Sequence, residues 1–331
     1  MSEPEGTPPG GHPVVVYIVG SGRSGSTLLE RMLGALPGVV NVGELVATFR
    51  NVLGNDELCG CGQAFSRCPF WTAVGTRAFG SGGWDDDVVT DFRRLELEVA
   101  RQRYFWRNLV PAFRGGQFGA GTRRYSELYG RLYRAILDES GATAVVDASK
   151  GLAHALAMAE GGGIDLRLVH LVRDARGVAF SWAKSGVARP QGVVPGATLS
   201  TFDTDLTAGR WTLLQTEIAL ARSRFSGYAR LRYEDLVERP AEEVARCMSE
   251  VGLPVDPGAL GHIEGQAVDL PVSHGLAGNP SRFRVGVQQL RLDEQWRRDM
   301  PGWDRTKTTA IALAPLLLYR YLPRDRSQAP A

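Results

Sequence analysis

A short apolar run followed by a glycine-rich turn constrains the fold of this chain most. Residues 14–19 read VVVYIV, the unbroken and largely β-branched pattern of a strand buried on both faces of a parallel sheet. The turn GSGRSGST follows, and residues 26–36 then carry apolar side chains at helical spacing until Pro37 and Gly38. This order predicts a phosphate-binding loop, in which backbone N–H groups and the helix dipole hold an anion.

The loop departs at one position from the nucleoside-triphosphate form, G-x-x-x-x-G-K-[ST]. Gly20, Gly25 and Thr27 fit that form, but Ser26 stands in place of the lysine. That lysine normally reaches the terminal phosphates, so its absence argues against ATP or GTP, and Arg23 supplies a cation instead. The residues that we expect to bind phosphate are Gly22, Arg23, Ser24, Gly25, Ser26 and Thr27.

Strand-then-helix patterns recur along the chain. Residues 144–146 and 166–172 repeat the buried-strand pattern, residues 229–233 repeat it more weakly, and each run precedes a helical pattern. This repetition predicts an α/β fold with three layers, α/β/α, around a central parallel sheet.

We expect one domain over residues 14–323. Within it, apolar spacing predicts a helical insertion over the active site at residues 85–140, and residues 185–205 have the composition of a lid or substrate loop. Residues 1–13 form an expected disordered tail, and residues 324–331 form a C-terminal tail.

Charge and composition exclude several classes of function. The net charge of +2, from 38 basic and 36 acidic residues, provides no general field for nucleic acid or an anionic membrane. The N-terminus lacks the basic and apolar regions of a signal peptide, and residues 308–322 are shorter than the roughly 20 apolar residues of a membrane span. Arginine outnumbers lysine strongly, as in proteins of GC-rich bacterial genomes. We therefore expect a bacterial, cytoplasmic protein with a small-molecule partner; the sequence leaves its oligomeric state open.

A second candidate binding element follows another predicted strand. Arg173 leaves that strand, and Ser181 lies on the ensuing helix. Arginine at this place points into the crevice where open α/β sheets bind ligands, and its planar fork suits a phosphate. The loop and this Arg…Ser pair together closely resemble the two signatures of the sulfotransferases, which use 3′-phosphoadenosine 5′-phosphosulfate (PAPS). The resemblance implies that the loop holds the 5′-phosphosulfate and that Arg173 and Ser181 hold the 3′-phosphate.

Further matches extend this resemblance over residues 14 to about 300. The loop with Arg23 is similar to the tyrosylprotein and bacterial branches and departs from the cytosolic steroid and phenol branch. The segment LRYEDLVERP resembles the family's Y-E-D-L segment, which implies that Tyr233 lies near the adenine. The segment SHGLAGNPSRFR resembles the late G-N-x-x-R loop of bacterial members, which implies that Asn279 and Arg282 close over the 3′-phosphate.

Sulfuryl transfer requires in-line attack by an acceptor whose proton a base removes. The resemblance to the tyrosylprotein-like branch implies that Glu44 is this base and that Lys150 stabilises charge on the bridging oxygen, with Arg23 on the sulfuryl oxygens. His154 is the rival base. We expect PAPS as co-substrate, 3′,5′-diphosphoadenosine (PAP) as product, and no metal.

Two other functions stay open, a P-loop small-molecule kinase and a catalytically inactive PAP-binding protein. The acceptor is expected, by analogy alone, to be a carbohydrate, natural product or lipid. Aromatic and basic residues of the insertion either line its cleft or only pack; they are Tyr104, Phe105, Trp106, Tyr125, Arg103, Arg107, Arg123 and Arg124.

Three crowded cysteines raise a separate question. Cys59, Cys61 and Cys68 have the spacing of a metal knuckle, but a fourth ligand is not evident nearby, and Cys247 is distant in sequence. A cysteine-lined turn without a metal is therefore the favoured interpretation. A disulfide between two of these thiols stays open outside a reducing compartment.

Overall fold

The computed structural model describes residues 11–114, 118–184 and 201–322. Most of both predicted tails, and residues 185–200 of the predicted lid, lie outside the described residues. The strands are β1 (Val14–Gly20), β2 (Val39–Asn41), β3 (Ala144–Lys150), β4 (Asp165–Val172), β5 (Gly227–Arg232), β6 (Ile263–Glu264), β7 (Ala267–Leu270) and β8 (Gly286–Gln289). The helices are α1 (Ser26–Gly34), α2 (Leu53–Asn55), α3 (Pro69–Phe79), α4 (Asp86–Leu95), α5 (Phe105–Arg114), α6 (Ala120–Ser140), α7 (Leu152–Glu160), α8 (Ala175–Ala183), α9 (Thr204–Ala221), α10 (Tyr233–Glu238), α11 (Pro240–Glu250), α12 (Gln295–Asp299), α13 (Gly302–Ile311) and α14 (Leu313–Leu318).

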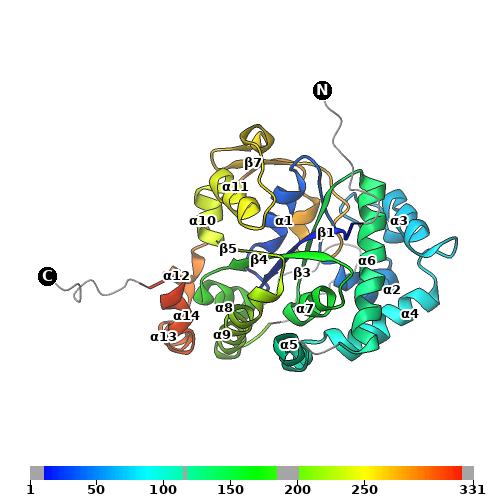
Figure 1. Ribbon diagram of the computed structural model, residues 1–331. Coiled ribbons are helices and arrows are strands. Elements are labelled where there is room, and N and C mark those ends of the chain that lie inside the picture. The colour runs from blue at the N-terminus through cyan, green and yellow to red at the C-terminus, as the bar shows by residue number, and fades with distance from the viewer. Residues whose placement is uncertain (1–10, 115–117, 185–200, 323–331) are drawn as a thin grey trace.

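The central sheet has five strands in the order β2-β3-β1-β4-β5, and each neighbouring pair is parallel. Helices α1, α10 and α11 lie on one side of this sheet, and α7, α8 and α9 lie on the other (Figure 1). The predicted three-layer α/β/α fold is therefore confirmed.

Strand β1 explains how both faces of the sheet are buried. Val15, Tyr17 and Val19 belong to one apolar core, which includes side chains of α6 and α7. Val16 and Ile18 belong to a second core, which includes side chains of α1 and α11. Because successive side chains of a strand point to opposite faces, the unbroken apolar run fills both cores at once.

Residues 85–140 are largely helical, as predicted, in α4, α5 and α6. Their aromatic side chains pack inside the protein: Phe92 stacks on Phe49 with ring centroids 3.8 Å apart, and Phe105 and Tyr125 are fully buried. Trp106 of the same segment lies at the surface, and the Arg107 guanidinium lies over the Tyr104 ring. These contacts support the alternative in which the aromatic residues of the insertion pack within the protein and do not line the acceptor cleft.

Two parts of the fold have no strong sequence signal. Strand β2 contains three residues, and the strands of the small antiparallel sheet β6-β7-β8 contain two to four. Alternation over so few residues cannot be told apart from loop sequence. Strand β2 nevertheless matters, because it extends the sheet beyond β3 and precedes Glu44.

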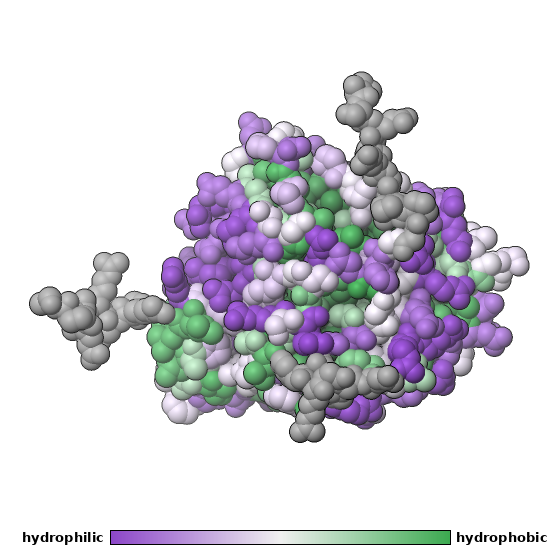
Figure 2. Space-filling view, viewed as in Figure 1, coloured by the Kyte–Doolittle hydropathy of each residue, from purple (hydrophilic) through white to green (hydrophobic). Residues whose placement is uncertain are grey.

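The visible surface mixes charged and apolar side chains, with an apolar patch over α13 and α14 (Figure 2). Exposed apolar residues in these two helices are Trp303, Ile311, Leu313, Leu317 and Leu318. No described helix has both the length and the hydropathy that crossing a bilayer requires.

The first prediction concerns Gly43, which joins β2 to the segment around Leu276. Gly43 has φ +75°, and an added Cβ would collide with the Leu276 backbone. Gly43→Ala should therefore lower the free energy of unfolding by more than about 1 kcal/mol in urea titrations. Gly209→Ala is the control, because Gly209 lies in α9 with open space at its Cβ position. This substitution should raise the free energy of unfolding by up to about 1 kcal/mol. Equal effects of the two substitutions would contradict this account of Gly43.

Candidate active site

The candidate site lies along the carboxyl ends of the five parallel strands. Because the strand order is β2-β3-β1-β4-β5, the residues that follow these strands form a row. Glu44 follows β2, Lys150 ends β3, the glycine-rich loop follows β1, and Arg173 and Tyr233 follow β4 and β5. All of them line one cavity of about 580 Å³. This volume is typical of a small-molecule site, and open α/β sheets bind ligands at this edge.

The glycine-rich loop takes a conformation that depends on its small residues. Gly25 has φ +92°, and a Cβ there would lie 2.5 Å from the Tyr233 ring. Helix α1 begins at Ser26, so its unpaired N–H groups face the cavity with Ser26 and Thr27. Backbone donors at a helix N-terminus favour an anion. Ser24 has another role: it is buried, and its Oγ donates to the Ser21 carbonyl oxygen at 2.6 Å.

Arg23 is the cation of the loop. It has φ +69°, a left-handed conformation that is costly for a side chain other than glycine. Its guanidinium lies 5.2 Å from the centre of the Trp182 ring, and Trp182 Nε1 donates to the Gly22 carbonyl oxygen at 3.2 Å. Trp182 thus fixes both the loop and its arginine. Trp182 carries no motif signal in the sequence, although it follows Ser181 directly.

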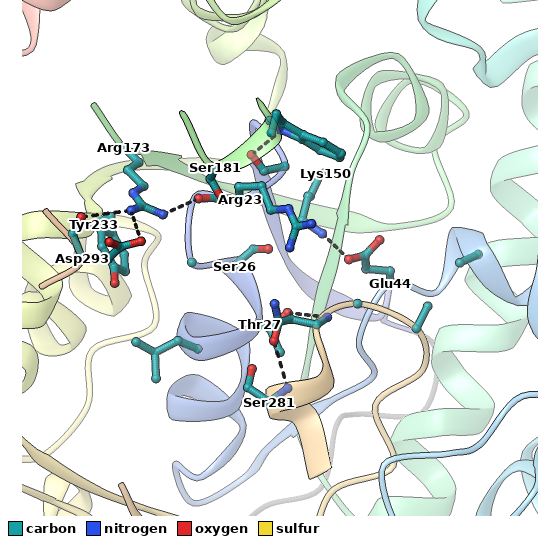
Figure 3. Close-up of a pocket in the computed structure, with 18 of the residues that line it drawn as sticks. Arg23, Ser26, Thr27, Glu44, Lys150, Arg173, Ser181, Tyr233, Ser281 and Asp293 are labelled. Atoms are coloured by element: carbon teal, nitrogen blue, oxygen red, sulfur yellow. Dashed lines mark hydrogen bonds and ion pairs between the residues drawn. The ribbon is translucent and has the colours of Figure 1, made fainter. Parts of the chain in front are cut away.

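Glu44 and Lys150 form an ion pair at one end of the cavity (Figure 3). The two side chains are 26% and 18% exposed, so both are shielded but still reachable from the cavity. Lys150 has φ +66°, another strained position. Strain of this kind persists only where surrounding contacts impose it, and it is concentrated at functional sites.

Asp147 and Ser149 hold the turn that carries Lys150. Ser149 donates from its backbone N and its Oγ to Asp147 Oδ1, at 2.8 Å and 2.5 Å, and its Oγ accepts from Val46 N at 3.0 Å. Tyr133 donates to Asp147 Oδ2 at 2.6 Å. Burial raises the pKa of Asp147 to about 6, although these hydrogen bonds favour its carboxylate. The network therefore ties the segment after Glu44 to the segment before Lys150.

Arg173 occupies the opposite end of the cavity with Tyr233 and Asp293 (Figure 3). Its guanidinium donates to the Arg23 carbonyl oxygen at 2.9 Å and to Asp293 Oδ2 at 3.0 Å, and it lies 4.8 Å from the centre of the Tyr233 ring. Ser181 lines the same cavity. Asp293 carries no motif signal in the sequence, so its pairing with Arg173 is new information from the structure.

The late G-N-x-x-R segment is placed differently from the expectation. Asn279 lines the cavity, but its backbone N lies 3.3 Å from Thr27 Oγ1, and Gly278 faces Glu44, away from the Arg173 end. Arg282 does not reach the cavity: it is 2% exposed and donates to the Leu58 carbonyl oxygen at 3.2 Å. The structure thus corrects the assignment of Arg282 to the 3′-phosphate, because its guanidinium is turned into the protein.

His154 is placed as a structural residue. It is 2% exposed, its Nδ1 lies 2.7 Å from the Tyr125 hydroxyl oxygen, and burial lowers the pKa of its imidazole to about 3. It does not line the cavity, and neither does any described side chain of the insertion. Of the two candidate bases, the geometry brings only Glu44 to the cavity.

Comparisons with known proteins agree with this fold. No protein-family model matches the chain. Human carbohydrate sulfotransferase 5 is 24% identical over 182 residues, 48% of this chain and 41% of that protein, so the match spans less than half of the relative. The sulfotransferase domain from the curacin biosynthetic pathway superposes with a TM-score of 0.51 at 15% identity, over 94% of this chain and 99% of that domain.

A second solved structure is the sulfotransferase domain from the Synechococcus PCC 7002 olefin synthase, with a TM-score of 0.48 at 19% identity over 96% of this chain and 98% of that domain. The curacin-pathway likeness shows a shared fold. In part of its sequence and in this fold, the chain resembles sulfotransferases.

Glu30, on α1 directly after the loop, is a buried carboxyl close to the site. It is 2% exposed and accepts from Asn41 Nδ2 at 3.1 Å. Burial, the largest cause, raises its pKa to about 8. Between pH 4.5 and 8 the folded protein therefore holds a proton that the unfolded chain has lost, so Glu30 makes stability fall as pH rises through this window.

The second prediction tests this linkage. Glu30→Gln should stabilise the protein relative to wild type, and the gain should grow from pH 5 to pH 8 by at most about 1.4 kcal/mol for each pH unit. Urea unfolding at each pH measures it. Glu127→Gln is the control, because the Glu127 side chain is 60% exposed and should give no such slope. A gain that is the same at every pH would show that Glu30 is ionised in the folded protein.

Proposed function

We propose that the protein is a sulfotransferase that transfers the sulfuryl group of PAPS to a hydroxyl or amine of a small-molecule acceptor. One observation carries the proposal: a single cavity brings together an anion-binding loop, an arginine and a serine at one end, and a carboxylate paired with a lysine at the other. The resemblance to sulfotransferases in sequence and fold supports it.

The row of strand ends suggests how the donor lies. The 5′-phosphosulfate binds backbone N–H groups of the loop from Gly22 to Thr27 and the hydroxyls of Ser26 and Thr27, as an anion at a helix N-terminus does. The 3′-phosphate binds Arg173 and Ser181, taking the place of the Asp293 carboxylate, which is 45% exposed. Tyr233, packed between Gly25 and Arg173, then borders the adenine.

The reacting groups lie toward the β2 and β3 end. Glu44 accepts the proton of the acceptor as the acceptor atom bonds to sulfur, and the bond from sulfur to the bridging oxygen breaks. Lys150 stabilises the negative charge that this oxygen gains as PAP leaves, and Arg23 contacts the sulfuryl oxygens. In the structure the Glu44 carboxylate contacts the Lys150 ammonium, so the proposed base and the proposed cation lie next to each other.

The acceptor is assigned only as a class. A carbohydrate or natural product agrees with the names of the similar proteins, a carbohydrate sulfotransferase and a domain of a biosynthetic pathway. Described residues that line the cavity and follow Glu44 closely in the sequence are Ala47 and Asn51. Their mixed polarity suits an acceptor that carries hydroxyl groups.

The charges of the cavity argue against the kinase alternative. The loop offers Ser26 where a kinase carries lysine, and two of the lining carboxylates, Glu44 and Asp293, are paired with Lys150 and Arg173. A carboxylate already paired with a protein cation is a poor ligand for magnesium. An inactive PAP-binding protein would have no use for the strained Lys150 and its partner Glu44.

The third prediction concerns the 3′-phosphate. PAP should bind more tightly than 5′-AMP, and Ser181→Ala should reduce the affinity for PAP by roughly tenfold or more while leaving 5′-AMP nearly unchanged. Asp293→Asn should raise the affinity for PAP, because it frees Arg173 from its carboxylate partner. Isothermal titration of the wild type and the two variants with PAP and with 5′-AMP measures these affinities. Equal losses of PAP and 5′-AMP in Ser181→Ala would place the 3′-phosphate elsewhere, and tighter binding of ATP with magnesium would favour the kinase.

The fourth prediction concerns the base. Glu44→Gln should keep the affinity for PAP and lower kcat by roughly 10²–10⁴, measured as PAP release with an acceptor found by screening sugars and phenols. Glu57→Gln is the matched control, since Glu57 lines the same cavity without pairing with Lys150, and it should retain most of the turnover. Near-normal turnover of Glu44→Gln would remove Glu44 from the mechanism.

A further inference from the structure

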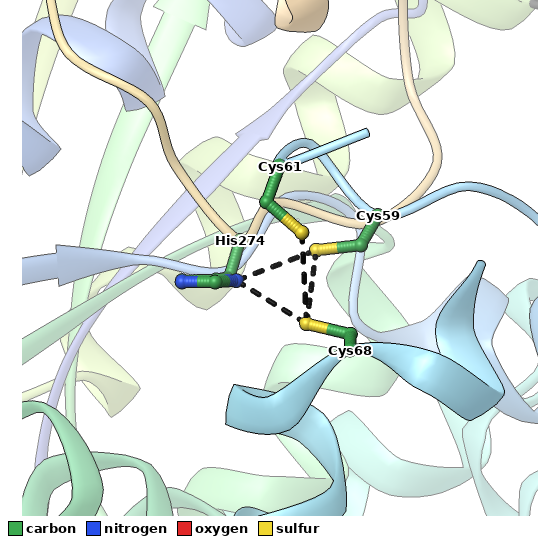
Figure 4. A group of neighbouring side chains, drawn as sticks. All are labelled: Cys59, Cys61, Cys68 and His274. Atoms are coloured by element: carbon green, nitrogen blue, oxygen red, sulfur yellow. Dashed lines mark hydrogen bonds between the residues drawn. The ribbon is translucent and has the colours of Figure 1, made fainter. Parts of the chain in front are cut away.

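Four side chains from distant parts of the chain meet beside the active-site wall. They are Cys59, Cys61, Cys68 and His274, and their ligand atoms all lie within 4.8 Å of one another (Figure 4). Cys59 and Cys68 are fully buried, and the other two are half-buried. His274 supplies the fourth ligand that the cysteine spacing alone did not reveal.

The distances match a tetrahedral metal site. Zinc at its usual distances of about 2.3 Å to sulfur and about 2.0–2.1 Å to nitrogen places two sulfurs about 3.8 Å apart, and sulfur and nitrogen about 3.5 Å apart. Cys68 Sγ lies 3.7 Å from both Cys59 Sγ and Cys61 Sγ. His274 Nδ1 lies 3.6 Å from Cys59 Sγ and 3.3 Å from Cys68 Sγ. These four edges agree with the tetrahedron to within a few tenths of an ångström.

The backbone holds the cysteines in this arrangement. Cys59 and Cys61 lie in a tight turn, where Cys59 N donates to the Gln63 carbonyl oxygen and Gly62 N donates to the Cys59 carbonyl oxygen, both at 2.8 Å. Gly62 has φ +86°, as such a turn requires. Cys68 is the N-cap residue of α3 and precedes Pro69, so the start of this helix fixes the position of its backbone.

Charge balance supports a bound divalent cation. Three thiolates and a neutral imidazole around Zn²⁺ leave one negative charge, and Arg282 lies close by with its bond to the carbonyl oxygen of Leu58, the residue before Cys59. Arg282 is 2% exposed, and its Nε and Nη1 have no partner among the described residues. A buried arginine is stabilised by negative charge nearby; Glu57 supplies part of that charge, and an anionic metal centre would add to it.

We propose that Cys59, Cys61, Cys68 and His274 bind one zinc ion as a structural site. Four protein ligands leave no open position, which is the mark of a structural centre rather than a catalytic one. Binding exchanges the thiol protons for the metal, and no redox step is involved. A disulfide would use only two of the three thiols and leave His274 without a role.

The zinc site would stabilise one wall of the cavity. The segment around His274 already contacts the cysteine turn: Gly60 N donates to the Gly275 carbonyl oxygen at 3.0 Å, and Trp71 Nε1 donates to the His274 carbonyl oxygen at 2.9 Å. Two residues further on, the Leu276 carbonyl oxygen accepts from Glu44 N at 2.8 Å. The metal thus joins the turn to the segment that positions Glu44.

Metal content tests the proposal. The full-length protein, purified without chelator from cells grown with zinc, should contain one zinc per chain by mass spectrometry of the metal. Cys61→Ser, at the least buried cysteine of the cluster, and His274→Ala should lose zinc and lower the melting temperature. Cys247→Ala is the matched control: it removes a buried cysteine outside the cluster and should keep the zinc.

A second measurement decides the matter if the variants do not fold. Wild-type protein stripped of metal by a chelator and given Co²⁺ should develop the sulfur-to-cobalt charge-transfer bands and the intense visible bands of a tetrahedral thiolate site. Wild-type protein that takes up neither zinc nor Co²⁺ would overturn the proposal. An intact mass lower by two hydrogens in the freshly purified protein would also overturn it, because it would identify a disulfide in place of the metal.

Discussion

The parallel pairing of β1 with both β3 and β4 is the constraint on which the rest of the structure depends. Because β1 occupies the middle of the sheet, its glycine-rich turn opens between the ends of its two neighbours. Lys150 comes from one neighbour and Arg173 from the other. The backbone thus places two cations on opposite sides of an anion-binding loop before any side chain is positioned.

At each end of the cavity, the cation is paired with a carboxylate. Lys150 is paired with Glu44, and Arg173 is paired with Asp293, so each cation has a carboxylate beside it. A nucleotide with anionic groups at both ends can contact both cations in one binding event. Asp293 is the more exposed of the two carboxylates, at 45% against 26% for Glu44, which makes the Arg173 end the easier place for exchange.

Short-range patterns predicted much of this molecule. The buried strands, the loop at residues 20–27 and the helical insertion all have local periodicity or glycine placement that physical rules recognise. The pairing of Glu44 with Lys150 is a tertiary contact across 106 residues, and only the resemblance to a family suggested both residues.

The misses have the same physical origin. His274 lies 206 residues from Cys68, so spacing could not reveal it as a neighbour of the three cysteines. For Arg282 the motif indicated a residue type and a loop but not the direction of the side chain, which packing decided. Strand β2 was missed because three residues show no periodicity, although it determines where Glu44 lies.

A crystal structure of the protein with PAP is the most direct test of the central claim. The account predicts the 5′-phosphate on the backbone of residues 22–27, the 3′-phosphate on Arg173 and Ser181, and the 5′-phosphate end directed toward Lys150 and Glu44. PAP bound in the reverse direction, or bound away from the loop, would contradict the account.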